Sequence, residues 1–393
     1  MPVRSSFIWN NTTEKFTLMN IVFLIRAIGS GGGAELQMTV LAKGLKCSGH
    51  QVTVIVLYGE GSDFEVELVK AGIHIIDLKK KGFWDVFGFL YRYVQTLKSI
   101  RPDVLHGYMP MQNLLVLLSQ LFLPRTKIVW GLRDSNIGFG NIPLSTQVFF
   151  KLSCWLSNKA DLIISNSESG KLFHINKGYP ANLIEVIPNG IDAEYFRHNE
   201  EGRQLLRQQW EVSDAQILIG NVARLDRKKD HSTFLRACAI LRQEYPHIKI
   251  VCAGEDSKEY REELDLLAKE LLLQDLLIWA GLCGDMAEVY SALDIEVCSS
   301  LYEGFPNAVA EAMSCSIPVV ATEVGDAKLM LESIGSCVHP GNPTALAKAM
   351  SAMLKKNLSD VGYRGRERIV ERYSVDNLVH RSETALKALL DKE

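Results

Sequence analysis

The sequence predicts two doubly wound α/β domains in tandem, each with a parallel sheet that helices cover on both faces. Short apolar runs rich in Val and Ile alternate with longer helical patterns along the whole chain. Such nearly continuous apolar strands are typical of parallel sheets. The alternation occurs twice, and the polar stretch 188–204 separates the two series. With 393 residues, the chain has room for about two domains of roughly 150 residues each.

Seven strands are expected in the first half, at 20–25, 51–57, 72–78, 103–108, 127–132, 161–166 and 184–189. The helical patterns between them include 34–46, 83–99 and 145–157. Six strands are expected in the second half, at 216–223, 247–254, 276–281, 294–300, 317–323 and 336–340. The intervening helices include 233–245, 259–272, 286–291, 307–315 and 344–356.

These elements divide the chain into four parts. Residues 1–18 are polar and irregular and lack the apolar core of a signal peptide, so we expect a flexible extension there. Residues 19–192 and 193–373 are the two expected domains, with the crossing point at 188–192. A helical stretch over 374–393 ends the chain.

Composition and charge indicate an ordinary globular protein, because 47% of its residues are hydrophobic and 23% are charged. Residues 1–192 hold 19 Lys and Arg against 14 Asp and Glu, whereas residues 193–393 hold 24 against 32. This contrast suggests different partners for the two domains, and the absence of a dense Lys/Arg stripe argues against a nucleic-acid partner. The eight cysteines form no Cys-x-x-Cys pair and no Cys/His cluster, which favours reduced thiols in a cytoplasmic protein.

The first candidate site follows the first strand of the second domain, in the stretch NVARLDRKKDH. Arg224 and Lys229 lie five residues apart in a loop that leads into a helix beginning near Ser232. In open α/β sheets, ligands bind outside the carboxyl ends of the strands. Two cations beside a helix N-terminus predict an anion site, although an isolated pair of this kind is more often a solvated basic turn.

A second loop, SLYEGFPNAVAEAM, supplies the other half of that site. It contains the turn formed by Gly304, Phe305, Pro306 and Asn307. Pro306 suits the first turn of a helix, whose free amides and dipole favour an anion. The two loops therefore predict a diphosphate clamp. Glu311, one turn inside this Ala-rich helix, needs a partner if buried and could accept hydrogen bonds from a ribose diol, while Glu303 could hold the hydroxyls of a sugar.

The motif E-G-F-P-N-A-V-A-E-A-M, followed by S-I-P-V-V-A-T and G-D, resembles the signature of the family-4 retaining glycosyltransferases, which have the GT-B fold. The glycine turn SGGGAE, the inter-domain stretch VIPNGID and the loop ARLDRKKDHSTFLRA resemble further parts of the same family. The resemblance covers nearly the whole chain, and the order and spacing of these motifs are more specific than any single one.

The resemblance implies two Rossmann-like domains facing across a cleft. The first would bind a glycan or lipid-linked acceptor and the second a nucleoside-diphosphate sugar, and the helix over 374–393 would return to the first domain. Arg224 and Lys229 would hold the diphosphate, Glu303 and Glu311 would form the E-x7-E pair, and Gly31, Gly32 and Gly33 would lie near the donor phosphates or the acceptor. No metal or other cofactor is expected, and no Asp-x-Asp pair occurs in the sequence.

One departure from the family pattern concerns the loop after the fifth strand, where many members carry a His near the reacting sugar. This chain has Arg133 and Asp134 there, and either its contacts to the sugar differ or the loop is aligned wrongly. His106, at the end of the fourth strand, and Asn136 are further candidates for the acceptor side, although His106 could equally be a structural histidine.

Of three alternatives, one is rejected and two stay open. The stretch GSGGGA fits a dinucleotide fingerprint, but the acidic residue expected about 20 residues later is missing, so we reject that interpretation. Residues 79–93 mix lysines with aromatic residues, and they either pack on the sheet or lie on an anionic membrane, which would place the enzyme at the inner face of the cell membrane. For function, the alternatives are a GT-B sugar-nucleotide epimerase or phosphorylase, and a non-catalytic nucleotide-sugar-binding protein.

Overall fold

The structure is a computed structural model, and it describes residues 18–29, 32–59, 61–82, 84–133, 135, 144–255 and 257–391. These residues form two compact units. The first unit contains the described residues up to Gly190 together with the C-terminal segment from Val375, and the second contains Ile191–Ser374. The expected extension 1–18 lies outside the described residues except for Leu18.

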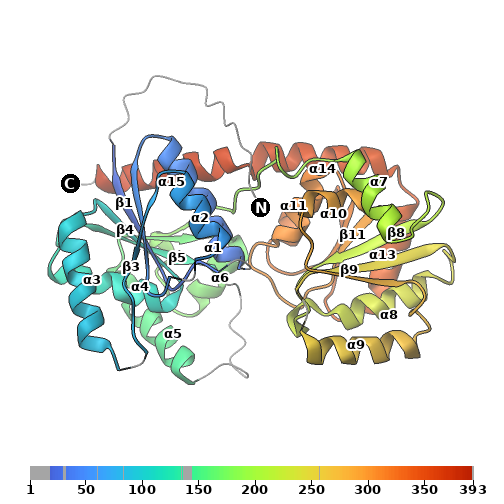
Figure 1. The fold of residues 1–393 in the computed structure, drawn as a ribbon, viewed down its shortest axis with the longest axis horizontal. Helices are drawn as coiled ribbons and strands as arrows, with labels where there is room; N and C mark the ends of the chain where they lie inside the picture. Colours follow the sequence, from blue (N-terminus) through green and yellow to red (C-terminus); the bar gives the residue numbers. More distant parts are fainter. Residues whose placement is uncertain are drawn as a thin grey trace. The chain divides into compact units, whose positions relative to one another are not determined.

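The first unit contains a seven-stranded parallel sheet in the order β3-β2-β1-β4-β5-β6-β7 (Figure 1). Its strands are β1 (Asn20–Ile25), β2 (Gln51–Val56), β3 (His74–Asp77), β4 (Val104–Tyr108), β5 (Lys127–Leu132), β6 (Leu162–Ser165) and β7 (Ile184–Val186). Its helices are α1 (Gly33–Cys47), α2 (Asp63–Lys70), α3 (Val86–Ile100), α4 (Pro110–Leu117), α5 (Leu144–Leu156), α6 (Glu168–Asn176) and α15 (Val375–Leu390). Short 3-10 helices are η1 (Leu118–Leu121), η2 (Ser157–Lys159) and η3 (Ala181–Leu183).

Helices cover both faces of this sheet, because successive side chains of a strand point to opposite sides. On β1, Phe23 packs into a core shared with α1, α2 and α15, whereas Leu24 packs into a core shared with α3 and α4. The last helix is fixed to this unit by a buried contact between His50 Nε2 and Glu383 Oε1 at 3.2 Å. Burial lowers the pKa of His50, against the effect of Glu383, so its neutral ring donates that bond while Nδ1 accepts one from the Met19 amide.

The second unit contains a six-stranded parallel sheet in the order β10-β9-β8-β11-β12-β13 (Figure 1). Its strands are β8 (Ile217–Val222), β9 (Ile248–Ala253), β10 (Leu277–Gly281), β11 (Ile295–Cys298), β12 (Val319–Thr322) and β13 (Ser336–Val338). Its helices are α7 (Glu200–Gln209), η4 (Arg227–Lys229), α8 (His231–Leu241), α9 (Lys258–Glu270), α10 (Met286–Ala292), α11 (Asn307–Ser314), α12 (Ala327–Leu331), α13 (Pro343–Leu354) and α14 (Leu358–Arg372). Helices α8, α9 and α13 cover one face, and α10, α11, α12 and α14 cover the other.

Both sheets are doubly wound, which confirms the predicted fold class. The strand order reverses between β1 and β4 in the first unit and between β8 and β11 in the second. Ligand crevices of open α/β sheets lie at such reversals, outside the carboxyl ends of the strands. Among the described residues, no helix is long and apolar enough to cross a membrane.

Candidate active site

The loops that follow β8 and β11 meet at the reversal point of the second sheet. Lys229 Nζ lies 2.5 Å from Glu303 Oε1, and the Ser300 hydroxyl donates a hydrogen bond to the same oxygen at 2.7 Å. The backbone joins the loops as well, because the Leu301 amide donates to the carbonyl of Lys228 at 2.8 Å. Two of the residues singled out from the sequence, Lys229 and Glu303, are therefore in direct contact.

Lys229 keeps its positive charge in this half-buried position. Burial has the largest single effect and lowers its pKa, but the adjacent Glu303 carboxylate and Cys298 together raise it by more, and the net shift is upward. The positive charge of Arg224 lowers the pKa of the same amine, so Arg224 and Lys229 lie near each other. Arg224 itself is exposed. Arg224 and Lys229 thus form a pair of cations at the carboxyl end of β8, and we call this pair the lip.

Backbone packing fixes the second loop. Gly325, after β12, has a φ of +54°, and a Cβ at this position would lie 2.2 Å from the carbonyl oxygen of Gly304. The next amide, from Asp326, donates a hydrogen bond to that carbonyl at 3.0 Å. Phe305 is buried and its ring meets the ring of Tyr373, with centroids 5.7 Å apart. Only glycine fits at 325 without displacing the turn that carries Glu303.

Helix α11 begins where the sequence predicts, with Pro306 at its N-cap and Asn307 as its first residue. Glu311 lies one turn further and accepts a hydrogen bond from the Tyr290 hydroxyl of α10 at 2.7 Å. Burial raises the pKa of Glu311, while Tyr290 and the charge of Lys229 lower it. Sequence analysis did not identify Tyr290, which lies in the middle of a separate helix and carries no motif.

The acceptor-side candidates lie in the first unit. His106 is buried, and its Nε2 has no hydrogen-bond partner among the described residues. Burial, aided by the charge of Arg133, holds its pKa well below the ordinary range, so the ring is neutral. The Arg133 guanidinium lies 4.4 Å from the centre of the Tyr108 ring and donates a hydrogen bond to Asn189 Oδ1 at 3.3 Å. The fourth and fifth strands thus bring His106 and Arg133 into one cluster.

The other candidates of the first unit concern the glycine turn and the loop after β5. Gly32 is the N-cap of α1, which begins at Gly33. A Cβ at Gly32 would lie 1.8 Å from Glu35 Oε2, so the start of this helix is closely packed. Gly31, Asp134 and Asn136 lie outside the described residues.

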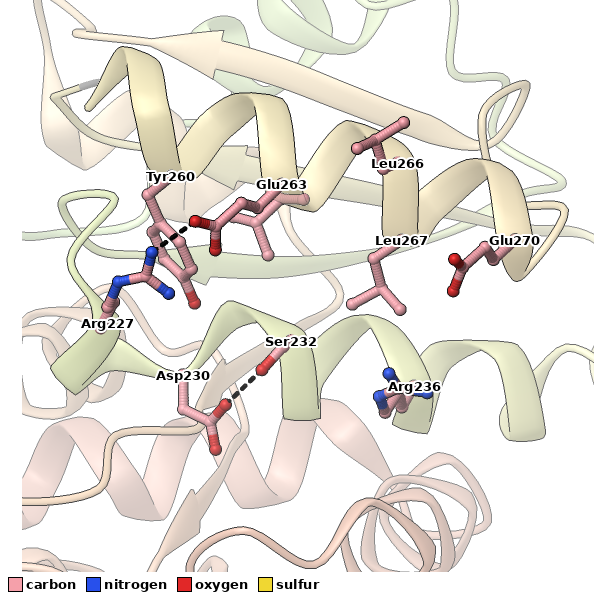
Figure 2. A pocket seen from close by; sticks show the side chains of 10 residues that line it. Arg227, Asp230, Ser232, Arg236, Tyr260, Glu263, Leu266, Leu267 and Glu270 are labelled. Atoms are coloured by element: carbon pink, nitrogen blue, oxygen red, sulfur yellow. Dashed lines mark hydrogen bonds and ion pairs between the residues drawn. The ribbon is translucent and has the colours of Figure 1, made fainter.

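A separate pocket of about 410 Å³ lies between α8 and α9 (Figure 2). Its rim carries an ion pair between Arg227 and Glu263, and its floor is formed by Leu264 and Leu267. Lys229, Glu303 and Glu311 do not line it, so it is distinct from the cluster that the β8 and β11 loops form. Among the residues that the structure describes, no group of three or more His, Cys, Asp or Glu is placed to hold a metal ion.

Comparisons with protein families cover both units. Residues 31–195 match the model "Glycosyltransferase Family 4", and residues 202–372 match the model "Glycosyl transferases group 1". Among curated proteins, an N-acetylgalactosamine-N,N'-diacetylbacillosaminyl-diphospho-undecaprenol 4-alpha-N-acetylgalactosaminyltransferase from Campylobacter jejuni is 24% identical over 95% of this chain and 100% of its own. The putative glycosyltransferase EpsF from Bacillus subtilis is also 24% identical, over 88% of this chain and 94% of its own.

Solved structures with the same fold include Anabaena Alr3699/HepE in complex with UDP. It has a TM-score of 0.82 and 22% identity, with 94% of this chain and 100% of that chain covered. WaaG, a glycosyltransferase involved in lipopolysaccharide biosynthesis, has a TM-score of 0.73 and 15% identity, with 93% and 99% covered. Together with the two family models, which span most of both units, these likenesses show that the chain belongs to the family-4 GT-B glycosyltransferases.

Proposed function

We propose that this glycosyltransferase moves a sugar from a nucleoside-diphosphate sugar to a glycan or lipid-linked acceptor, with retention of the anomeric configuration, in the synthesis of a surface polysaccharide or glycolipid. The observation that carries the proposal is the contact of Lys229 with Glu303 at the reversal point of the second sheet. Two comparisons support it. The Campylobacter relative is named for transfer to a diphospho-undecaprenol acceptor, and HepE binds UDP and UDP-glucose.

In this proposal, Arg224, Lys229 and the amides that begin α11 hold the diphosphate, and Glu311 holds the ribose. During transfer, the bond between the anomeric carbon and the phosphate oxygen breaks, and negative charge develops on the diphosphate. Fixed cations and helix amides stabilise such charge, so the proposed mechanism needs no metal ion. Glu303 orients the sugar hydroxyls.

The acceptor hydroxyl attacks the same face that the diphosphate leaves. Its proton passes to the departing phosphate oxygen, and the products are the glycosylated acceptor and the protonated nucleoside diphosphate. No protein nucleophile is required, which distinguishes this route from a retaining glycosidase with two flanking carboxylates. We place the acceptor on the first unit, near His106 and Arg133 and beside the start of α1.

The test is a reaction of the full-length protein with UDP- and GDP-sugars, with and without undecaprenol-diphosphate saccharides. We expect nucleoside diphosphate to be released only when the acceptor is present, and NMR of the product to show the anomeric configuration of the donor. Release without an acceptor, or an epimerised donor, would instead indicate an epimerase or phosphorylase. Tight donor binding without turnover against any acceptor would indicate a non-catalytic binding protein.

A lipid-linked acceptor would require contact with a membrane surface, and the first unit carries a face suited to it. Residues 79–93 have one side packed on the sheet and one side that would suit the membrane role. Phe89 and Tyr93 are buried against the sheet, whereas Phe87 and Tyr91 lie on the opposite side of α3 and are 87% and 67% exposed. Both sides of this helix are therefore apolar.

Helix α5 and η1 repeat this pattern on the same side of the sheet. Helix α4 lies between α3 and α5, because Tyr93 bonds to the backbone of Leu115 and α4 packs on α5. Phe150 of α5 is buried, whereas Trp155 is 76% exposed, and Leu121 of η1 is 85% exposed. We call the exposed side of α3, η1 and α5 the basic aromatic face.

The charge of this face matches an anionic bilayer. Residues 79–101, 110–125 and 144–159 contain nine Lys and Arg but a single acidic residue, Asp85, which pairs with Arg92. The helices on the opposite side of the sheet, α1, α2 and α15, hold five basic and six acidic residues. Basic residues beside exposed aromatic side chains bind anionic lipid surfaces, whereas two copies of such a face would repel each other.

We propose that the basic aromatic face holds the enzyme on the inner surface of the cell membrane. Sedimentation with phosphatidylcholine vesicles containing phosphatidylglycerol tests this. The change Lys98→Glu with Lys151→Glu should lower vesicle binding more than tenfold, since each basic residue near the surface contributes about fivefold. Phe87→Ser with Trp155→Ser should also weaken it. The matched control, Lys70→Glu with Val69→Ser on α2, should bind like the wild type.

Turnover of a water-soluble acceptor should be unchanged in all of these variants, which separates membrane contact from catalysis. Equal binding to vesicles of pure phosphatidylcholine would contradict the anionic-lipid proposal. A lipid-independent dimer that the face variants dissociate would assign the face to a second copy of the chain instead.

A further inference from the structure

Strands β8 and β11 separate at their carboxyl ends. Backbone pairing between them ends at Gly220 and Glu296, although β8 continues along β9 as far as Val222. Likewise, β11 continues along β12 as far as Cys298. This separation lies at the reversal point of the sheet, directly before the loops that carry Lys229 and Glu303. Beyond this point, the backbone groups that β8 and β11 direct toward each other need other hydrogen-bond partners, because unpaired buried amides are costly.

Side chains supply these partners. Glu296 is 1% exposed, and its Oε1 accepts a hydrogen bond from the Val222 amide at 3.0 Å. Beside it, the buried Asn221 amide group donates to Ser299 Oγ at 3.0 Å, and the Ser299 hydroxyl donates to the carbonyl of Lys229 at 2.8 Å. Side-chain hydrogen bonds therefore bridge the two strands beyond their backbone pairing, and Glu296 holds the last residue of β8.

The second carboxyl oxygen of Glu296 is buried and has no hydrogen-bond partner among the described residues. No Lys, Arg or His of the described chain forms an ion pair with this carboxyl group. The titratable groups that interact with it are Glu311 on α11 and Tyr290 on α10, and these two are hydrogen-bonded to each other. Glu296 thus lies close to the carboxylate assigned to the ribose.

Burial raises the pKa of Glu296 to about 8; the Val222 amide lowers it, and the negative charge of Glu311 raises it further. At neutral pH the group is a protonated carboxyl whose carbonyl oxygen still accepts the Val222 bond. When it ionises, a second negative charge appears close to Glu311, which holds the donor ribose in the proposed site.

We infer that Glu296 is a positioning residue that holds the end of β8 and makes donor binding depend on pH, with its protonated form supporting binding and its ionised form weakening it. This inference rests on the proposed donor site. It concerns no step of the transfer itself, because Glu296 lies in the sheet behind the residues that would touch the donor. A purely structural role would leave the pH dependence of binding unchanged when Gln replaces Glu.

The test is the affinity for UDP between pH 7 and 9.5, measured by calorimetry on the full-length protein. For the wild type we expect the Kd to rise roughly tenfold over this range, which is the effect of one added like charge about 12 Å from a donor charge at an effective dielectric constant of about 20. Glu296→Gln keeps an oxygen for the Val222 amide, so it should bind as the wild type does at pH 7 but show no rise. Glu296→Leu cannot accept that bond and should bind less tightly throughout.

Glu263→Gln removes one exposed carboxylate from the same unit and is the matched control, which should keep the wild-type rise. The inference is overturned if Glu296→Gln shows that rise too. Thermal unfolding without nucleotide gives an independent readout. The pKa of Glu296 is higher in the folded protein than in the unfolded chain, so this group favours the fold most at pH values below its unfolded pKa. That contribution to stability is lost as the pH increases toward 8.

Glu296→Gln should therefore melt roughly 10 °C or more above the wild type at pH 9 and lose most of this advantage at pH 5. If the difference in melting temperature between the two proteins is the same at pH 5 and at pH 9, the inference is overturned. Absence of UDP, GDP and ADP binding by the wild type at every pH would refute the proposed donor site, while the melting curves would still decide whether Glu296 carries a proton.

Discussion

At the scale of single residues, the candidate site consists of half-buried charges that each have a partner. Glu303 raises the pKa of Lys229 against the effect of burial, and Tyr290 donates a hydrogen bond to one oxygen of Glu311. An unpaired buried charge would cost several kcal/mol, so these pairs allow the fold to keep ionic groups at the mouth of an apolar helix. A diphosphate would add negative charge beside Lys229 and Arg224, where the second unit is otherwise rich in acidic residues.

At the scale of elements, packing between the loops fixes the turn that carries Glu303. Gly325→Ala should destabilise the fold by about 2–3 kcal/mol, because the new Cβ meets the Gly304 carbonyl at 2.2 Å and φ is positive. It should also weaken UDP binding, since the displaced turn begins α11. Denaturant unfolding measures the first effect and calorimetry the second.

The control for this prediction is Gly341→Ala. Gly341 also has a positive φ, +70°, but a Cβ there would meet nothing within 4 Å. It should cost only about 1 kcal/mol and leave nucleotide binding unchanged. If both variants lose the same stability and both bind UDP normally, the packing of Gly325 on Gly304 does not control the site.

Sequence patterns are sufficient to predict where the strands lie in the chain, because each of the 13 predicted strands overlaps a strand of the structure. Buried parallel strands are short apolar runs, and such runs are visible in a sequence. The separation of β8 from β11 is not visible, because it depends on which strands are neighbours. For this reason the sequence assigned no role to Glu296, although a Glu in the middle of an apolar strand was a detectable signal.

The contacts within the candidate site could likewise be predicted only in part from the sequence. The sequence placed Arg224, Lys229 and Glu303 on two loops at one edge of the sheet, and Glu311 one turn inside the helix that follows the second loop. Tyr290 was missed because its hydroxyl reaches Glu311 from another helix. Similarly, the composition of 79–93 indicated an amphipathic segment but could not separate buried Tyr93 from exposed Phe87.

At the scale of the whole molecule, the chain crosses between its two units twice, between Gly190 and Ile191 and between Ser374 and Val375. The first crossing is anchored on the first unit by Gln37 of α1, which bonds to both the amide and the carbonyl of Gly190. The second begins α15, which belongs to the first unit. Each unit carries one part of the proposed function, with the donor on the second and the acceptor and membrane surface on the first.

The central claim is that the lip formed by Arg224 and Lys229 binds the diphosphate of the donor. Its most direct test is the affinity of the full-length protein for UDP, GDP and ADP, compared between the wild type, Lys229→Ala and the neighbouring control Lys228→Ala. We predict that the wild type and the control bind at least one of these nucleotides equally well, and that Lys229→Ala binds it up to about 100-fold less tightly, the scale for loss of a hydrogen bond to a charged group. Equal affinity in all three proteins would contradict the claim.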